Sequence, residues 1–413
     1  MTLRDAALVG IIAVAGLTEV VGGQNAGSDW PQWRGPSRDG TLTAFAEPKA
    51  WPEHLTQRWK VEVGTGYATP ILVGSRVYAF SRQGEKEVMR ALDAASGKVV
   101  WETSYPAPFM MNPATARHGP GPKSTPTYAN GRLFTLGMSG IVTAFDATTG
   151  KQVWQKPAPP VEPLFHTGQS ALVDRDVVIL HVGGHKQGAL TAFDQATGAV
   201  KWSWDGDGPS YGSPILADIG GTRQVITFSQ ENLIGVDAAN GRLLWRVPFV
   251  ARAITNSITP LVYGNQTVIV SGQGEPLTAY TISKRNDQWS ADVAWKNPQL
   301  SLAFSNAVIV GDAVFSMSAL NSGQFFWADA KTGKTLWTSS PRQAGNAAIV
   351  RAGNLLFVLT DDAELMVARP TPGGFEPIKT YTVADSATWP APSFSGNRIF
   401  VKDISTIALW TVN

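Results

Sequence analysis

The apolar residues of this chain fall in short runs of strand length, and no stretch carries the longer period of an amphipathic helix. Pairs of such runs are joined by Gly, Asn or Asp turns, which is typical of antiparallel strands. Eight pairs follow one another, at residues 71–78, 126–134, 172–180, 215–228, 261–270, 308–315, 349–358 and 393–401. The pattern predicts an all-β domain.

A second pattern recurs between these pairs: an Asp, a Gly four residues later, and a Trp four residues after that. Asp can start a tight turn by bonding the backbone ahead of it, and Gly supplies a positive φ at no steric cost. Trp carries more apolar surface than one hairpin can bury, so its fixed register predicts packing against the neighbouring unit rather than independent places in a sandwich core. The five copies are Asp93, Gly97, Trp101; Asp146, Gly150, Trp154; Asp194, Gly198, Trp202; Asp237, Gly241, Trp245; and Asp329, Gly333, Trp337.

The spacing of the repeat sets the architecture. Trp residues at positions 59, 101, 154, 202, 245, 295 and 337 are 42 to 53 residues apart, which is the four-stranded period of a propeller blade. A charged segment, 283–287, and a Pro/Gly loop, 370–374, replace the turn in two units. The last unit ends with one strand, 406–412, and the strand at 59–63 has no unit before it. We therefore predict an eight-bladed β-propeller of four-stranded blades, with the ring closed by an N-terminal strand.

The start of the chain differs from the rest. Residues 6–17 form an apolar run too short to span a bilayer, followed by small residues, as in a signal peptide. We interpret 1–27 as a signal peptide, with a buried strand as the alternative, 28–50 as an N-terminal extension, and 51–413 as the propeller. The chain has no Cys, so neither a disulfide nor a lipid-modified Cys is expected. We expect a periplasmic or extracellular monomer with no transmembrane span in the mature chain.

The charge pattern excludes one class of partner. The net charge is +2, and basic residues neither form a run nor alternate with aromatic residues. Nucleic-acid binding proteins concentrate Lys and Arg on one face or stripe. We expect no nucleic acid partner.

The unit Ala144 to Trp154, read as Ala-x-Asp-x-x-Thr-Gly-Lys-x-x-Trp, resembles the repeat of pyrroloquinoline-quinone (PQQ) type propellers, over about residues 51 to 412. The segments 30–36, 38–40 and 118–126 resemble secreted bacterial members of that superfamily. One branch contains quinone-dependent alcohol dehydrogenases, which hold PQQ and Ca²⁺ in the central funnel. This chain departs from them in its length and in lacking both Cys and an acidic cluster. The other branch, the outer-membrane β-barrel assembly lipoprotein, is a non-catalytic eight-bladed scaffold, but its lipid-anchored Cys is missing here.

Candidate ligand-binding residues lie where the chain enters the innermost strands. They are amides, hydroxyls and aromatic residues, which suit hydrogen bonding and stacking of a polar ligand or peptide. The candidates at these entries are Gln169, Asn256, Asn306, Asn346 and Trp389. Because acid–base catalysis needs a positioned titratable group, we assign no catalytic residue.

Two Pro-rich insertions, 106–122 and 157–168, flank the same entries. If they converge, they form a basic cup over the channel, suited to a carboxylate or a tricarboxylic quinone. Its members are Arg117, His118, Lys123, His166 and Arg252. The alternative is a solvated loop cover without a ligand. His181 and His185 lack further ligands for a metal site, so none is expected.

The expected function is a binding or scaffold protein whose partner is an envelope protein or a small polar ligand. The alternative is a PQQ-dependent dehydrogenase with a reduced site in the channel; PQQ with Ca²⁺ is implied only by the resemblance. A further alternative is a propeller that recruits a β-strand peptide along one face.

Overall fold

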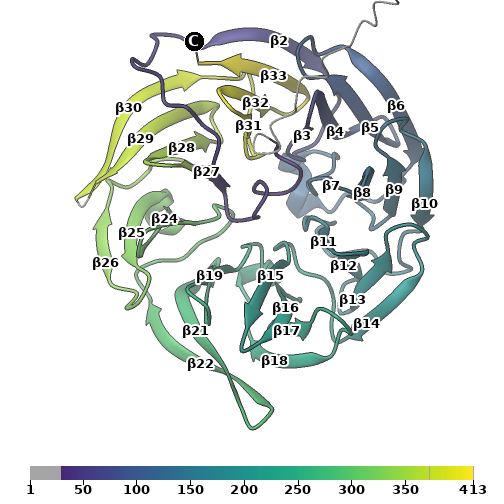
Figure 1. Ribbon diagram of the computed structural model, residues 1–413, viewed down its shortest axis with the longest axis vertical. Coiled ribbons are helices and arrows are strands. Elements are labelled where there is room, and N and C mark those ends of the chain that lie inside the picture. Colours follow the sequence, from purple (N-terminus) through teal and green to yellow (C-terminus); the bar gives the residue numbers. More distant parts are fainter. Residues whose placement is uncertain (1–28, 372, 413) are drawn as a thin grey trace, which may run out of the picture.

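In the computed structural model, which describes residues 29–371 and 373–412, eight sheets stand around a central channel like the blades of a propeller (Figure 1). Each blade has four antiparallel strands that run in order from the channel to the rim. The prediction of an eight-bladed, all-β propeller is confirmed. Residues 1–27, interpreted as a signal peptide, lie outside the described residues. None of the described helices is long and apolar enough to cross a membrane.

The strands of blades 1 to 4 are β3 (Ile71–Val73), β4 (Arg76–Gln83), β5 (Lys86–Asp93) and β6 (Val99–Pro106); β7 (Thr127–Ala129), β8 (Arg132–Leu136), β9 (Val142–Asp146) and β10 (Gln152–Lys156); β11 (Leu172–Asp174), β12 (Val177–Gly184), β13 (Gln187–Asp194) and β14 (Val200–Asp205); and β15 (Ile215–Ile219), β16 (Thr222–Phe228), β17 (Asn232–Asp237) and β18 (Leu243–Pro248).

Blades 5 to 8 contain β19 (Leu261–Tyr263), β20 (Thr267–Gly272), β21 (Glu275–Arg285) and β22 (Gln288–Asn297); β23 (Val308–Val310), β24 (Ala313–Ser318), β25 (Gln324–Asp329) and β26 (Thr335–Thr338); β27 (Ala347–Ala352), β28 (Leu355–Thr360), β29 (Glu364–Thr371) and β30 (Gly374–Thr382); and β31 (Ser393–Ser395), β32 (Arg398–Lys402), β33 (Thr406–Thr411) and β2 (Thr56–Glu62). The described residues also contain three short 3₁₀ helices: η2 (Pro113–His118), η3 (Arg252–Ile254) and η4 (Leu320–Ser322).

The ring closes as the sequence predicts, because β2 pairs antiparallel with β33 and supplies the outer strand of blade 8. The second and third strands of most blades are buried along most of their length, whereas outer strands such as β6 are largely exposed. The buried apolar residues form clusters that join adjacent blades, for example Phe134 and Leu180 in blades 2 and 3. The core of the protein is thus a ring of blade-to-blade interfaces.

The Asp and Gly residues make the tight turns between the third and outer strands. In four copies the Asp Oδ1 atom accepts a hydrogen bond from both the N–H and the hydroxyl of the residue three places on; for Asp146 and Thr149 both distances are 2.8 Å. The five glycines have φ between 71° and 73°, a left-handed conformation that favours Gly. The turn chemistry expected from the sequence is confirmed.

Five of the seven repeated Trp residues bond the turn of the next blade. The Nε1 atom of Trp101 donates to Ala147 O at 3.1 Å, and a Cβ atom built on Gly150 would lie 2.3 Å from the Trp101 ring. The same bond, to the residue after the next Asp, is made by Trp59, Trp154, Trp202 and Trp295 at 3.0 to 3.1 Å. Trp245 differs, because blade 5 has the long β21–β22 hairpin instead of this turn, and its Nε1 bonds Gln224 Oε1 within blade 4.

Residues 29–42, here called the N-terminal segment, lie across the channel (Figure 1, purple). Trp30 forms an isolated β-bridge with Leu72 of blade 1. Further along the segment, β1 (Thr41–Leu42) pairs in parallel with β27 of blade 7. Trp30 is 0% exposed and its ring lies 5.8 Å from that of Phe394 in blade 8. The sequence indicated only an extension over 28–50, with no role in the ring; the structure places part of it at the centre of the fold.

Two buried arginines hold this segment in the channel. Arg38 donates to Ala171 O at 2.7 Å and Ser170 O at 3.0 Å, both at the start of blade 3. Arg34 donates to Ala307 O at the start of blade 6. Burial lowers the pKa of Arg34 to about 10 and that of Arg38 to about 9, so both remain charged at neutral pH.

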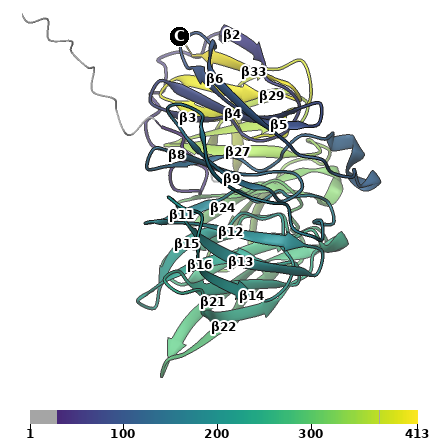
Figure 2. The ribbon, with the colours of Figure 1, turned by 90° about the vertical axis from the view of Figure 1, so that its right-hand side faces the viewer.

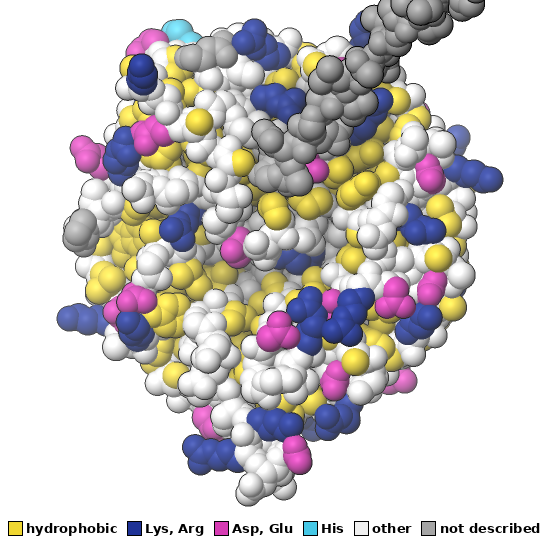
Figure 3. All heavy atoms as spheres, in the orientation of Figure 1, with side chains coloured by type: hydrophobic (Ala, Val, Ile, Leu, Met, Phe, Trp, Pro, Cys, Tyr) yellow, Lys and Arg dark blue, Asp and Glu magenta, His cyan; other side chains and the backbone are white. Residues whose placement is uncertain are grey.

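Figure 3 shows the face that carries this segment, where basic and acidic side chains are intermixed.

Candidate functional site

The described residues enclose a cavity of about 320 Å³ in the channel, on the far side of the N-terminal segment. Figure 2 shows η2, the dark-blue coil at the right, on the opposite face of the ring from that segment. Trp33 of the N-terminal segment lines the cavity, and its Nε1 atom donates to Thr259 Oγ1 at 3.0 Å. The cavity therefore lies between η2 and the segment that crosses the channel. Its volume is at the lower end of the range of roughly 300–1,000 Å³ for small-molecule pockets.

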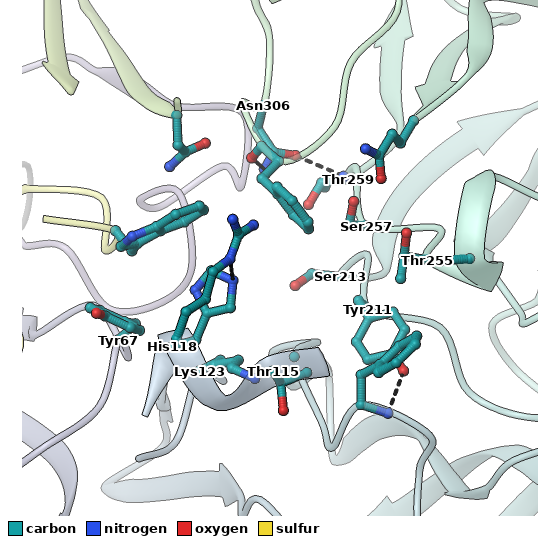
Figure 4. A pocket seen from close by; sticks show the side chains of 18 of the residues that line it. Tyr67, Thr115, His118, Lys123, Tyr211, Ser213, Thr255, Ser257, Thr259 and Asn306 are labelled. Carbon is teal, nitrogen blue, oxygen red and sulfur yellow. Dashed lines mark hydrogen bonds between the residues drawn. The ribbon is translucent and has the colours of Figure 1, made fainter. Parts of the chain in front are cut away.

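The inner-strand entries of several blades supply the walls (Figure 4). The lining combines cations, carboxamides, hydroxyls and aromatic rings, and contains no Asp or Glu. Its principal members are Trp33, Tyr67, Arg117, His118, Lys123, Phe165, Tyr211, Ser213, Ser257, Thr259, Gln273, Phe304, Asn306, Asn346 and Trp389.

Six of the ten sequence-predicted binding residues line this cavity: Arg117, His118, Lys123, Asn306, Asn346 and Trp389. Asn306 accepts a bond from Thr259 N at 2.7 Å, and Asn346 accepts one from Ser305 Oγ at 3.0 Å. These amides therefore also tie neighbouring blade entries to one another. Whether they hold a ligand stays a prediction.

The other four candidates lie outside the lining. Gln169 bonds both the N–H and the carbonyl of His181, and Asn256 bonds four backbone groups, including Ala251 N at 2.9 Å. Both amides are buried and hold inner-strand entries in place. Arg252 is exposed on η3. Of the five residues predicted to form a basic cup, three therefore line the cavity together: Arg117, His118 and Lys123.

His166 is buried beneath the first insertion instead of facing the cavity. Its ring lies edge-on to Phe109, with 4.8 Å between ring centroids, and its Nε2 atom faces Asn112 N at 3.5 Å. Burial and then the charge of Lys123 lower the pKa of His166 to about 4, so the ring is neutral near pH 7. Its observed contacts are those of a residue that supports the loop before η2.

His118 orients Arg117 at the mouth of the cavity. Arg117 Nε donates to His118 Nε2 at 3.1 Å, and the His118 ring stands perpendicular to Trp389, with 4.6 Å between centroids. Burial, followed by the charges of Arg117 and Lys123, lowers the pKa of His118 to about 4. The imidazole is therefore neutral near pH 7, as an acceptor of the Arg117 bond must be.

Lys123 lies at the entry to β7 and is partly buried in the wall. Burial lowers its pKa to about 8. The pair of cations with aromatic walls is suited to holding an anion with a flat body.

Aromatic residues form much of the remaining wall, and sequence reasoning found only some of them. Trp389 lies 5.9 Å from Phe304 and 6.4 Å from Tyr67, measured between ring centroids. Phe165, Phe304 and Trp33 were not among the candidates: Phe165 lies in the second insertion, Phe304 precedes an inner strand, and Trp33 belongs to the N-terminal segment. The aromatic position two residues before Asn306 was a local signal for Phe304, but nothing local placed Trp33 in the channel.

A family model described as outer membrane protein assembly factor BamB matches residues 38–221 and 85–329 of the chain. The outer membrane protein assembly factor BamB of Burkholderia pseudomallei is 26% identical over 361 residues, covering 76% of this chain and 88% of that protein. A solved structure of BamB from Moraxella catarrhalis superposes with a TM-score of 0.60 at 17% identity, covering 86% of this chain and 97% of that one, which supports the fold.

In sequence, the quinone branch matches over a shorter stretch. The dehydrogenase subunit of the alcohol dehydrogenase (quinone) of Acetobacter aceti is 32% identical over 148 residues, which is 33% of this chain and 19% of that subunit. This chain therefore aligns with about a fifth of the length of that relative. Both branches of the PQQ-like repeat proteins are related to this chain, and the resemblance inferred from the repeat is confirmed.

Proposed function

This chain belongs to the family described as outer membrane protein assembly factor BamB, and from that premise we propose that it is a binding or scaffold protein of the cell envelope. In this proposal it acts in the periplasm or outside the cell, by presenting its faces and its cavity to partners rather than by catalysis. The observation that carries it is the sequence match to assembly factors along most of both chains, whereas the sequence match to dehydrogenase subunits is local.

The side chains that line the cavity also support a role without PQQ-dependent catalysis. Ca²⁺ takes about six to eight oxygen ligands, usually with carboxylates among them. The cavity lining contains no carboxylate, and the described residues include no group of three His, Cys, Asp or Glu side chains that could hold a metal ion. The residues present therefore do not fit PQQ together with Ca²⁺.

The experiment is deletion of the gene in the source organism, followed by measurement of folded outer membrane proteins in isolated envelopes. We expect their amount to fall and to be restored by the wild-type gene, because the relatives are named for assembly of such proteins. Unchanged amounts of every outer membrane protein would contradict the assembly role.

The alternative, a PQQ-dependent dehydrogenase with a reduced site, is supported by sequence matches to dehydrogenase subunits over about a third of this chain, such as the 148-residue match. It is tested by titrating purified protein with PQQ and Ca²⁺ and following absorbance, thermal stability and oxidation of alcohols or sugars. We expect no activity and no spectral shift. Turnover of an alcohol would overturn the non-catalytic proposal.

A further inference from the structure

The positive side chains that line the cavity have no negative side chain beside them in the lining. Arg117 and Lys123 both line it, and no Asp or Glu does. The two histidines nearest these cations, His118 and His166, have pKa values lowered to about 4 and are neutral near pH 7. Near neutral pH the lining therefore carries two positive charges and no negative one.

The cationic groups also keep hydrogen-bonding capacity in reserve. Arg117 uses Nε for His118, and its two terminal nitrogens have no partner among the described residues. Lys123 Nζ likewise has no hydrogen bond or ion pair within the described part of the chain. Lys402 is different: its buried Nζ donates to three carbonyls, those of Gly64, Asp403 and Ile404. A structural lysine of this protein is thus satisfied by the backbone, whereas Lys123 is not.

Flat aromatic rings form the wall next to these cations. Trp389 stands perpendicular to His118 and nearly perpendicular to Phe304, so the three rings meet at steep angles beside the loop that carries Arg117. Ser213, Ser257 and Thr259 lie across the cavity from His118 in Figure 4. A neutral sugar is usually held by acceptors for its many hydroxyls, and carboxylates, the strongest acceptors, are missing here. An unsaturated body with one anionic end matches the lining better.

We propose that this cavity binds a small carboxylate with a flat, unsaturated body, holding the carboxylate between Arg117 and Lys123 and the body against Trp389 and Phe304. The proposal names the ligand class for the binding role proposed above and rests on that role. A free organic acid and the aromatic C-terminal end of a peptide share this chemistry. The N-terminal segment provides the inner wall through Trp33, so ligand binding also reaches a residue whose fluorescence can be followed.

The test is isothermal titration calorimetry and Trp fluorescence with the full chain and 2-naphthoate, its neutral counterpart 2-naphthamide, and inorganic phosphate. We expect 2-naphthoate to bind about tenfold more tightly than 2-naphthamide, because only the carboxylate can form charge-assisted hydrogen bonds with the two cations. Phosphate, which has no flat body, should bind weakly. No binding of 2-naphthoate at millimolar concentration, or equal affinity for the amide, would overturn the proposal.

Substitutions test whether Arg117 and Lys123 hold the carboxylate. Lys123→Met and Arg117→Gln should each weaken 2-naphthoate binding about tenfold. Arg252→Gln is the matched control, since Arg252 is a neighbouring basic residue outside the cavity lining, and its affinity should equal that of the wild type. Thermal unfolding confirms that each variant is folded. Binding that neither cavity variant weakens would refute the assignment.

The pH dependence offers an independent readout. A lysine is charged below its pKa, so affinity for 2-naphthoate should fall as the pH rises through about 8, the lowered pKa of Lys123. The groups near Lys123 are Arg117 and the histidines His118 and His166, which are already neutral at this pH. The fall should therefore disappear in Lys123→Met. A wild-type affinity unchanged between pH 7 and about 9 would contradict the role of Lys123.

A short peptide ending in Phe, compared with the same peptide carrying a C-terminal amide, distinguishes the two sources. Tight binding of the free acid alone would assign the site to a chain end; binding of 2-naphthoate but not of the peptide would assign it to a small molecule. Failure here is separable from failure of the proposed function. A deletion strain that loses outer membrane proteins, together with a protein that binds no flat acid, would refute only the ligand site.

Discussion

At the rim of the ring, five blades present a Trp that makes the same bond to the next turn, whereas the side chains that fill the channel differ from blade to blade. The rim is built from neighbours in a repeat, so one short pattern specifies it many times. The channel is built from single residues that meet only when the ring closes. Trp33, Arg117 and Trp389, for example, lie in the N-terminal segment, in blade 1's connection to blade 2, and before blade 8.

The two ends of the channel also differ in how they use positive charge. Arg34 and Arg38, in the N-terminal segment, donate to backbone carbonyls of the blades and act as structural ties. Arg117 and Lys123, at the other end of the channel, retain donors without a partner among the described residues. Stability is therefore expected to depend on the rim and the N-terminal segment, and ligand recognition on the residues that the repeat does not specify.

The largest effect should come from removing the anchor of the N-terminal segment. Trp30→Ala deletes a fully buried indole between blades 1 and 8 and should lower the free energy of unfolding by about 3–5 kcal/mol. Trp33→Ala, which removes a partly exposed indole from the same segment, is the control and should cost less. Chemical denaturation measures both. An equal loss in the two variants would show that Trp30 is no special anchor.

A smaller decrease in the free energy of unfolding is expected from a substitution at the rim. In Gly150→Ala the new methyl group would lie 2.3 Å from the Trp101 ring, so overpacking should destabilise the fold by about 1–3 kcal/mol beyond the cost of the positive φ. Gly131→Ala isolates that cost, since Gly131 has φ +74° and nothing within 4 Å of the built Cβ, and should lose about 1 kcal/mol. Similar denaturation midpoints for the two variants would contradict blade locking by Trp101.

The smallest effect concerns the charge of a single turn. Bonds from the Thr197 backbone, then the Lys201 and Thr197 side chains, lower the pKa of Asp194 to about 2. Because the folded pKa lies below the unfolded value of about 3.9, the carboxylate contributes stability above that value, which is lost as the pH falls through about 2. Wild type should therefore be more stable than Asp194→Asn at pH 6, with the gap closing near pH 2. Thermal unfolding at several pH values measures it; a constant gap would refute the linkage.

The candidate site was predicted in part because inner-strand entries follow from the repeat. Asn306, Asn346 and Trp389 were found that way, and they line the cavity. Gln169 and Asn256 occupy equivalent entries, yet their amides are consumed by nearby backbone groups, which depends on loop conformation and not on residue type. Trp33 and the two buried arginines escaped prediction because their partners are distant in sequence, as with Arg38 and Ala171.

The sequence by itself determined the eight blades, the turn in each repeat, the Trp contact with the next blade and the closure by β2, because all of these arise from short-range patterns repeated at a constant period. Only the tertiary structure decided that the N-terminal segment crosses the channel and that Arg117, Lys123 and the aromatic rings enclose one cavity. The reason is geometric. A ring brings eight separate entries and a distant segment to one axis, and no local pattern records which side chains meet there.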